Sequence, residues 1–339
     1  MDVFSHLLLG FILGQGLGLD TNLQLILIVS SVSLDIDALP IRSREAVLRT
    51  HRGPLHSVLV ALLASLAIAT GYTFFMHLPA TTLLSVILIC LAGLLSHLLL
   101  DVSTTGGITA LWPFSRKNIA LNLTHFIDPT FLVTLLIAAL SIIVLKTDTT
   151  AVRIVAAAAV TFLTLTSGVR YCERNAATKI IKRLGNGVAT EIVSLPTLRP
   201  DRWWTIEKIH FESGHRYEIY RVDSFRKKIL DKDTVESPYT HYSGPADPPI
   251  DSPQKAIACS KKNERISATV DGFVLPAVSI NHSKEDDTWQ VFWHDAFTYA
   301  VKREQRGILA HIKVDGTITT EARWPHTTPP RDSSQVKND

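Results

Sequence analysis

The stretch Gly93-Leu-Leu-Ser-His-Leu-Leu-Leu-Asp101 places two ionisable side chains at the end of an apolar segment. Residues 81–100 contain no Asp, Glu, Lys or Arg, and they match the roughly 20 residues that a helix needs to cross a bilayer. The spacing of four puts His97 and Asp101 on one helix face, where an imidazole nitrogen and a carboxylate oxygen can point at the same atom. This geometry suits a metal site, although an isolated pair of this kind is more often a histidine with a carboxylate partner near a helix end.

Charged residues are distributed unevenly along the 339-residue chain. Residues 1–169 contain 8 of the 34 Lys and Arg and 8 of the 31 Asp and Glu, whereas residues 170–339 contain the other 26 and 23. The sequence therefore predicts an α-helical polytopic membrane domain followed by a small, mostly-β soluble domain. Basic and acidic residues are interspersed in the second half, so no nucleic-acid partner is expected. The three cysteines are far apart and indicate neither a disulfide framework nor a CxxC metal site.

The first half contains about six hydrophobic segments, the first two of which could form a hairpin that does not fully cross the bilayer. They cover residues 3–19, 23–34, 57–75, 81–100, 130–145 and 153–169. The first has neither a preceding basic region nor a cleavage site, so we expect a retained helix rather than a signal peptide. Its Gly10, Gly14 and Gly18 form a stripe that allows another helix to approach closely. The basic segments 42–52, 116–117 and 170–183 follow every second span, which predicts that they share the cytoplasmic side.

Candidate ligands fall on that same side of the membrane. They are His6, Asp35, Asp37, His51, His56, His97, Asp101, His125 and Asp128. Ionisable groups at membrane depth are costly and usually face one another or a cavity, so their clustering indicates a common site. Taken singly, several of these residues have a simpler interpretation. Asp35 and Asp37 could be solvated acids after a span, and Asp128 could be an N-cap before Pro129.

Mixed imidazole and carboxylate ligands suit a divalent metal, with Zn²⁺ as the first choice and Mn²⁺ or Fe²⁺ as alternatives. A bound ion makes hydroxide available near neutral pH, so hydrolysis is the natural use of such a site. Asp37 could act as a general base, and Arg52 could hold an anionic oxygen of a phosphate. The alternatives are that Asp37 is a solvated acid and that Arg52 only marks the cytoplasmic side.

Six motifs in a fixed order carry a family resemblance. They are His6, SLDID at 33–37, HRGPLHS at 51–57, SHLLLD at 96–101, WPFS at 112–115 and FIDP at 126–129. Together they resemble the YdjM-like family of bacterial membrane-bound metal-dependent hydrolases over about residues 1–170. This resemblance implies a protein of the bacterial inner membrane, with metal ligands at His6, Asp35, His51 or His56, His97, Asp101 and also Asp128. The HxxxD motif is more faintly similar to zinc-dependent phospholipase C and its related nucleases, but the chain lacks their later HxxxE, which leaves the number of ions open.

The second half has no apolar segment long enough to cross a membrane. Alternating patterns at 188–195, 203–211 and 217–222 predict strands, and Asp315-Gly316 predicts a tight hairpin turn in an antiparallel sheet. The expected domains are a membrane-embedded domain at 1–170, a basic connecting helix at 171–185, a soluble β-rich domain at 186–325 and a disordered tail at 326–339.

The leading hypothesis is a membrane-bound metal-dependent hydrolase with its site at the cytoplasmic face and a C-terminal domain in the cytoplasm. Its substrate would be a phosphoester or a lipid-like small molecule, and its partner the lipid bilayer. A transporter or proton relay is a second possibility, because buried His and Asp also mark ion pathways, although the candidates here lie on one side only. A third is a membrane-tethered binding protein with a structural metal site.

Overall fold

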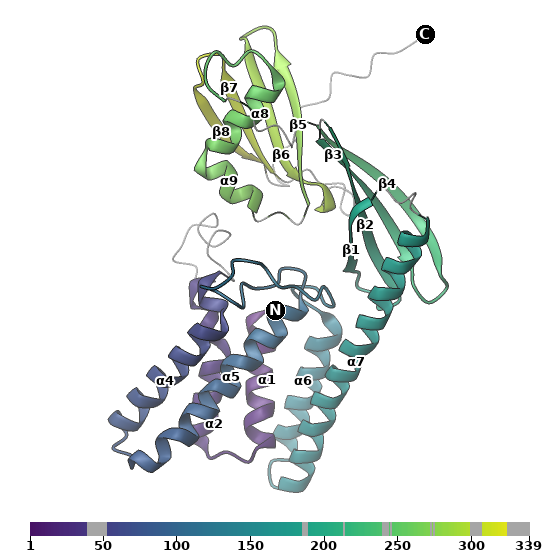
Figure 1. Cartoon of the computed structure of the whole chain (residues 1–339). Coiled ribbons are helices and arrows are strands. Elements are labelled where there is room, and N and C mark those ends of the chain that lie inside the picture. The colour runs from purple at the N-terminus through teal and green to yellow at the C-terminus, as the bar shows by residue number, and fades with distance from the viewer. Residues whose placement is uncertain are drawn as a thin grey trace. The chain divides into compact units, whose positions relative to one another are not determined.

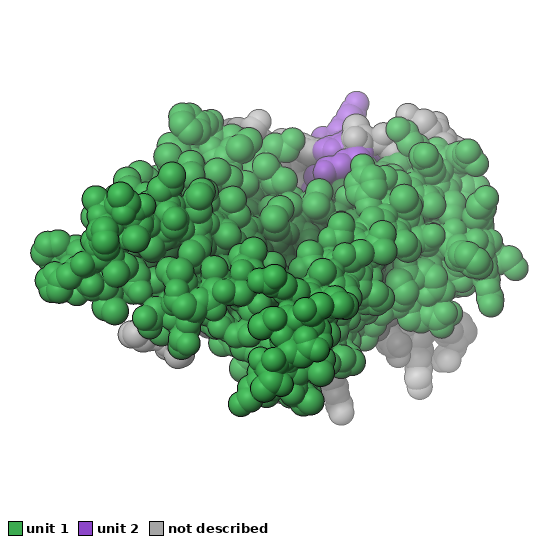
Figure 2. All heavy atoms as spheres, turned by 90° about the horizontal axis from the view of Figure 1, so that it is seen from below, with its two compact units in different colours: residues 1–187, 192–206, 220–231 green, residues 188–191, 207–219, 232–339 purple. Residues whose placement is uncertain are grey.

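A computed structural model gives the fold of the chain. It describes residues 1–38, 53–184, 189–212, 214–238, 244, 246–271, 273, 275–298 and 307–323. The chain divides into two compact units, coloured in Figure 2. Unit 1 comprises residues 1–187, 192–206 and 220–231, and unit 2 comprises residues 188–191, 207–219 and 232–339.

Unit 1 begins with α-helices that lie side by side in Figure 1. They are α1 (Val3–Gly16), α2 (Thr21–Val32), α4 (Val58–Phe75), α5 (Leu83–Ser103), α6 (Pro129–Val144) and α7 (Thr149–Leu184), with short 3-10 helices η1 (Ser33–Ala38), η2 (Pro54–His56) and η3 (Ala80–Thr82). Among the described residues, three helices are long and apolar enough to cross a membrane: α4, α7, and η3 continued by α5. The prediction of six spans is therefore not confirmed, because α1, α2 and α6 are shorter apolar helices.

Side-chain caps fix where these shorter helices begin. The carboxylates of Asp2, Asp20 and Asp128 accept backbone N–H groups in the first turns of α1, α2 and α6. With 14 residues, α1 rises only about 21 Å, whereas the hydrocarbon core of a bilayer is about 30 Å thick. Hydropathy alone does not reveal the length of this helix, because it does not separate a helix from the apolar turn that follows it.

Helix α2 approaches α1 and α5 closely at two glycines. A Cβ atom on Gly10 would lie 2.4 Å from Ser31 Oγ, and one on Gly93 would lie 2.6 Å from the carbonyl oxygen of Leu27. The Ser31 hydroxyl also donates a hydrogen bond to the His6 carbonyl at 3.0 Å. Gly10 and Gly14 of the stripe expected on the first helix thus lie against α2, whereas Gly18 follows the end of α1 and lies near Arg153. Helix α2 is held between the two helices that carry His6 and His97.

We expect Gly93→Ala to destabilise the protein by about 1–3 kcal/mol, because the added methyl group meets backbone atoms that cannot rotate away. Gly71→Ala is the matched control, since an added Cβ there meets no described atom within 4 Å. The control should gain up to about 1 kcal/mol from its better helix propensity. Thermal unfolding in detergent compares the two variants, and equal stabilities would contradict the close approach.

The C-terminal part is mostly β and contains two four-stranded sheets. The first has the order β1 (Ala189–Pro196), β2 (Arg202–Phe211), β3 (Gly214–Asp223), β4 (Lys228–Pro238), and the second has the order β5 (Pro276–Ser283), β6 (Thr288–Asp295), β7 (Gly307–Lys313), β8 (Ile318–Arg323). Helices α8 (Pro253–Lys262) and α9 (Glu264–Asp271) connect the two sheets and pack on the second. Strands β5 to β8 are antiparallel, and the predicted turn at Asp315-Gly316 joins β7 to β8.

Helix α7 runs unbroken from the last apolar segment into the region predicted as a separate basic connecting helix. Near its C-terminal end, Ala177 and Ile181 pack with Trp203 of β2 and Val222 of β3 in one buried cluster. The end of this helix therefore packs with the first sheet, and all four of these residues belong to unit 1. The predicted tail at 326–339 lies outside the described residues.

Candidate metal centre

Four buried side chains converge at the end of the helical bundle where the N-terminus lies in Figure 1. Asp35 comes from η1, His56 from η2, and His97 and Asp101 from the last turns of α5. Each offers one ligand atom, and these atoms all lie within 4.8 Å of one another. The four-residue spacing on α5 thus places His97 and Asp101 together, while helix packing brings the other two residues to them.

Four separations within the cluster suit pairs of ligands to one metal ion. His97 Nε2 lies 3.4 Å from Asp101 Oδ2 and 3.6 Å from Asp35 Oδ1. His56 Nε2 lies 3.5 Å from each of the same two oxygens. These distances exceed the roughly 2.7–3.2 Å of N–H···O hydrogen bonds. They match the roughly 3.4 Å that separates two ligand atoms of a tetrahedral ion with bonds of about 2.1 Å.

The hydrogen bonding of His97 defines which nitrogen faces the cluster. Its Nδ1 lies 2.8 Å from the Ser31 carbonyl oxygen, which can only accept, so Nδ1 carries the proton in the neutral ring. The Nε2 lone pair then points toward two carboxylates, and this atom makes no hydrogen bond among the described residues. Lone pairs that face carboxylate oxygens repel unless a cation lies between them. A backbone carbonyl on the second nitrogen is also the usual way of orienting a metal-binding histidine.

His6 lies beside the four residues and contacts the other oxygen of Asp101. Its Nε2 is 3.5 Å from Asp101 Oδ1, and its ring stacks on His97 with centroids 3.7 Å apart. The buried amino group of Met1 forms an ion pair with the same oxygen. Sequence reasoning contained no signal for Met1 or for Ser31.

Asp128 is occupied elsewhere, which differs from the ligand role expected for it. Its Oδ1 accepts the N–H groups of Thr130 and Phe131 at the start of α6, and both oxygens accept hydrogen bonds from buried Arg170. Arg170 also donates to the Leu123 carbonyl oxygen at 3.2 Å. A carboxylate that caps a helix and pairs with an arginine has little capacity left for a metal ion. The alternative reading of Asp128 as an N-cap is therefore favoured.

The remaining candidates contribute no described contact to the cluster. His51 and Arg52 lie outside the described residues, and so does the side chain of Asp37. His125 is half-buried and is not part of the group. Burial lowers the pKa of His125, and the nearby Asp128 carboxylate opposes this effect.

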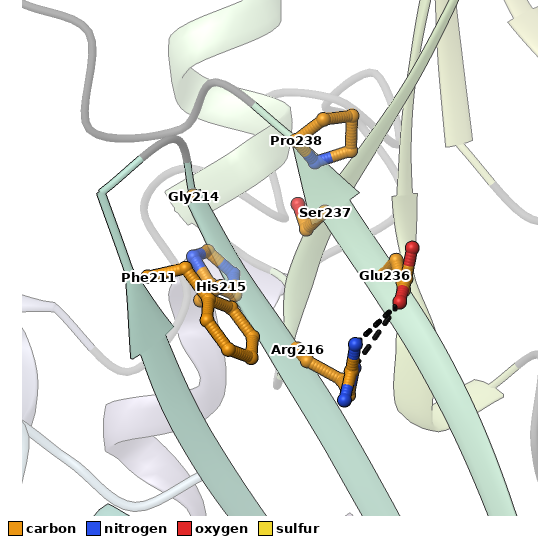
Figure 3. A pocket seen from close by; sticks show the side chains of 7 residues that line it. All are labelled: Phe211, Gly214, His215, Arg216, Glu236, Ser237 and Pro238. Carbon is orange, nitrogen blue, oxygen red and sulfur yellow. Dashed lines mark hydrogen bonds and ion pairs between the residues drawn. The ribbon is translucent and has the colours of Figure 1, made fainter.

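A separate pocket lies at the ends of β2, β3 and β4 (Figure 3). It is lined by Phe211, Gly214, His215, Arg216, Glu236, Ser237 and Pro238. Arg216 donates two hydrogen bonds to Glu236 Oε1, at 3.1 and 2.9 Å, so the charged groups of this pocket already neutralise each other. His215 packs edge-on against Tyr217, with ring centroids 4.7 Å apart. We assign no chemistry to this pocket.

Comparison with known proteins agrees with the motif order. The sequence model of the YdjM inner membrane protein family matches residues 1–176, which include all four clustered residues and His6. The chain belongs to this family. It is also 32% identical over 146 residues to the uncharacterized protein YfhP of Bacillus subtilis, an alignment that covers 38% of this chain and 42% of YfhP. No solved structure matches the chain, and the similarity to zinc-dependent phospholipase C is not shown.

Proposed function

We propose that this member of the YdjM family is a metal-dependent hydrolase, with Asp35, His56, His97 and Asp101 as metal ligands. The observation that carries the proposal is the buried Nε2 of His97, fixed as an acceptor and directed at two carboxylate oxygens. Two neutral imidazoles and two carboxylates carry two negative charges. The buried amino group of Met1 offsets one of them at Asp101 Oδ1, and a divalent cation among the four ligand atoms would neutralise the remainder. Without such a cation, burying both carboxylates would be strongly unfavourable. The donor set suits Zn²⁺, with Mn²⁺ or Fe²⁺ as alternatives.

A divalent ion in such a site lowers the pKa of water and stabilises negative charge on a substrate oxygen. The Ser31 carbonyl fixes the ring of His97, so this ligand needs no reorganisation during the reaction. Asp37, two residues after Asp35, is our candidate for taking a proton from the attacking water. Arg52 is our candidate for holding an anionic oxygen of the substrate.

Apolar side chains beside the ligands favour a lipid-like substrate. Phe4, Ile36 and Leu55 are 72%, 64% and 41% exposed, and each lies within two residues of His6, Asp35 or His56. Each of the three is close to a ligand along the chain, and exposed apolar side chains can contact a membrane or an apolar ligand. A substrate with an acyl chain could bind there and present its polar group to the ligands.

We also propose that the site and the β-rich part lie on the cytoplasmic side. The support is positive charge directly after the last candidate span, at Arg174, Lys179, Lys182 and Arg183. Arg170 is buried in an ion pair, so it does not contribute to the exposed positive charge that marks the cytoplasmic side. A reporter enzyme fused at residue 190 tests on which side of the membrane the β-rich part lies. An external reporter would contradict the proposed cytoplasmic location.

The proposed function is tested on full-length protein purified in detergent. We expect at least one divalent ion per chain by elemental analysis, and hydrolysis of a phosphodiester or a short-chain phospholipid that stops on chelation and returns on adding Zn²⁺ or Mn²⁺. A metal-free protein, or hydrolysis that chelation leaves unchanged, would contradict the proposal.

A proton relay is less compatible with the cluster, because separations of 3.4 to 3.6 Å are too long for a chain of hydrogen bonds.

A further inference from the structure

The stacked rings of His6 and His97 set a geometric limit on the metal centre. Their centroids are 3.7 Å apart, and their planes differ by only 13°. A metal ion bound to an imidazole nitrogen lies close to the plane of the ring, along the nitrogen lone pair. At a bond length of about 2.1 Å, a tilt of this size brings the two planes together by less than about 1 Å. A single ion therefore cannot lie in the planes of both rings.

Asp101 presents a different oxygen to each of these histidines. Its Oδ1 lies 3.5 Å from His6 Nε2, whereas its Oδ2 lies 3.4 Å from His97 Nε2 and 3.5 Å from His56 Nε2. All three separations suit two ligands of a common ion. A carboxylate whose two oxygens face separate groups of nitrogen ligands is placed to bridge two ions.

We propose that the centre binds two divalent ions, bridged by Asp101. Asp35, His56, His97 and Oδ2 of Asp101 hold the first ion, and His6 and Oδ1 of Asp101 hold the second. Ions held in two ring planes whose centroids lie 3.7 Å apart would be a few ångströms apart, as the ions of two-metal hydrolytic sites are. This inference rests on the proposed metal centre and is compatible with the phosphoester substrate proposed for it, because paired ions at this spacing stabilise both the attacking and the leaving oxygen of a phosphoryl group.

The two positions differ in their number of ligands, so they differ in affinity. The first has four protein ligands, and the second has two among the described residues. The amino group of Met1 contacts the same oxygen, Oδ1, and an ion there would replace this positive charge. The second ion should therefore exchange more readily and be lost first on dialysis.

The test loads full-length protein with Mn²⁺ and combines elemental analysis with electron paramagnetic resonance, neither of which depends on activity. We expect two Mn²⁺ per wild-type chain and the spectrum of a spin-coupled pair. His6→Gln should retain one Mn²⁺ with the six-line spectrum of an isolated ion. His125→Gln is the matched control, because this histidine lies outside the cluster, and it should keep the coupled pair.

One isolated Mn²⁺ in the wild type would overturn the two-ion proposal and leave the proposed function intact, whereas no bound metal would overturn both. Loss of both ions in a folded His6→Gln variant would also contradict the proposal, because binding of the first ion would then depend on His6. Circular dichroism shows whether this variant is folded. If the His6→Gln variant does not fold, the spectrum of the wild-type protein is the test. A spin-coupled pair supports the proposal, and an isolated ion contradicts it.

Discussion

Replacing His97 or Asp101 by alanine is expected to remove bound metal and to abolish hydrolysis while leaving the protein in the membrane. Each side chain supplies a direct ligand atom, so the loss of metal affinity should exceed the roughly 10- to 100-fold cost of removing an outer partner of a ligand. Neither substitution makes α5 less apolar, so insertion should be unchanged. Elemental analysis and phosphodiester hydrolysis on purified protein measure the two effects.

Ser96→Ala is the matched control on the same helix. Within the part of the chain that the structure describes, the Ser96 hydroxyl donates to the Gly93 carbonyl of α5, at 2.7 Å, and Ser96 is not part of the cluster. This variant should keep its metal and its activity. Full metal content in both His97→Ala and Asp101→Ala would remove the basis of the hydrolase proposal, and the HxxxD motif would then be an ordinary helix end.

Helical periodicity made one part of this site predictable from sequence. His97 and Asp101 share a face because they are four residues apart, and their position at the end of an apolar segment marks them as unusual. The approach of Asp35, which follows α2, depends on how closely α2 packs against α5, and this in turn depends on a glycine, Gly93. The approach of His56, which precedes α4, depends on the packing of α4 against α5. The motif order grouped these residues only through the family resemblance, since spacing alone left each with a simpler explanation.

Other features could not be predicted because they depend on contacts between distant residues. Asp128 and Arg170 are 42 residues apart in the sequence. From sequence alone, Asp128 is explained as a helix cap and Arg170 as a positive charge on the cytoplasmic side. The stacking of His6 on His97 depends on the packing of separate helices, which no periodicity encodes. Six spans are not confirmed, because α1, α2 and α6 have only 14, 12 and 16 residues.

The ion pair between Arg170 and Asp128 leads to the second large expected effect. The side chains are 3% and 2% exposed, and the arginine also donates to the Thr130 hydroxyl at 3.2 Å. Arg170→Met leaves the Asp128 carboxylate buried without its counter-charge, so we expect destabilisation by about 3–5 kcal/mol. Thermal unfolding or resistance to proteolysis in detergent measures the loss.

Two further variants separate the charge effect from a general sensitivity of α7. The double variant Arg170→Met, Asp128→Asn should recover part of the loss, because asparagine removes the unpaired charge and still caps α6. Arg153→Met replaces an exposed arginine on the same helix and should change stability by no more than about 0.5 kcal/mol. If the double variant is no more stable than Arg170→Met, an unpaired carboxylate is not the cause. Metal content should be normal in every variant that folds, because neither Asp128 nor Arg170 belongs to the cluster.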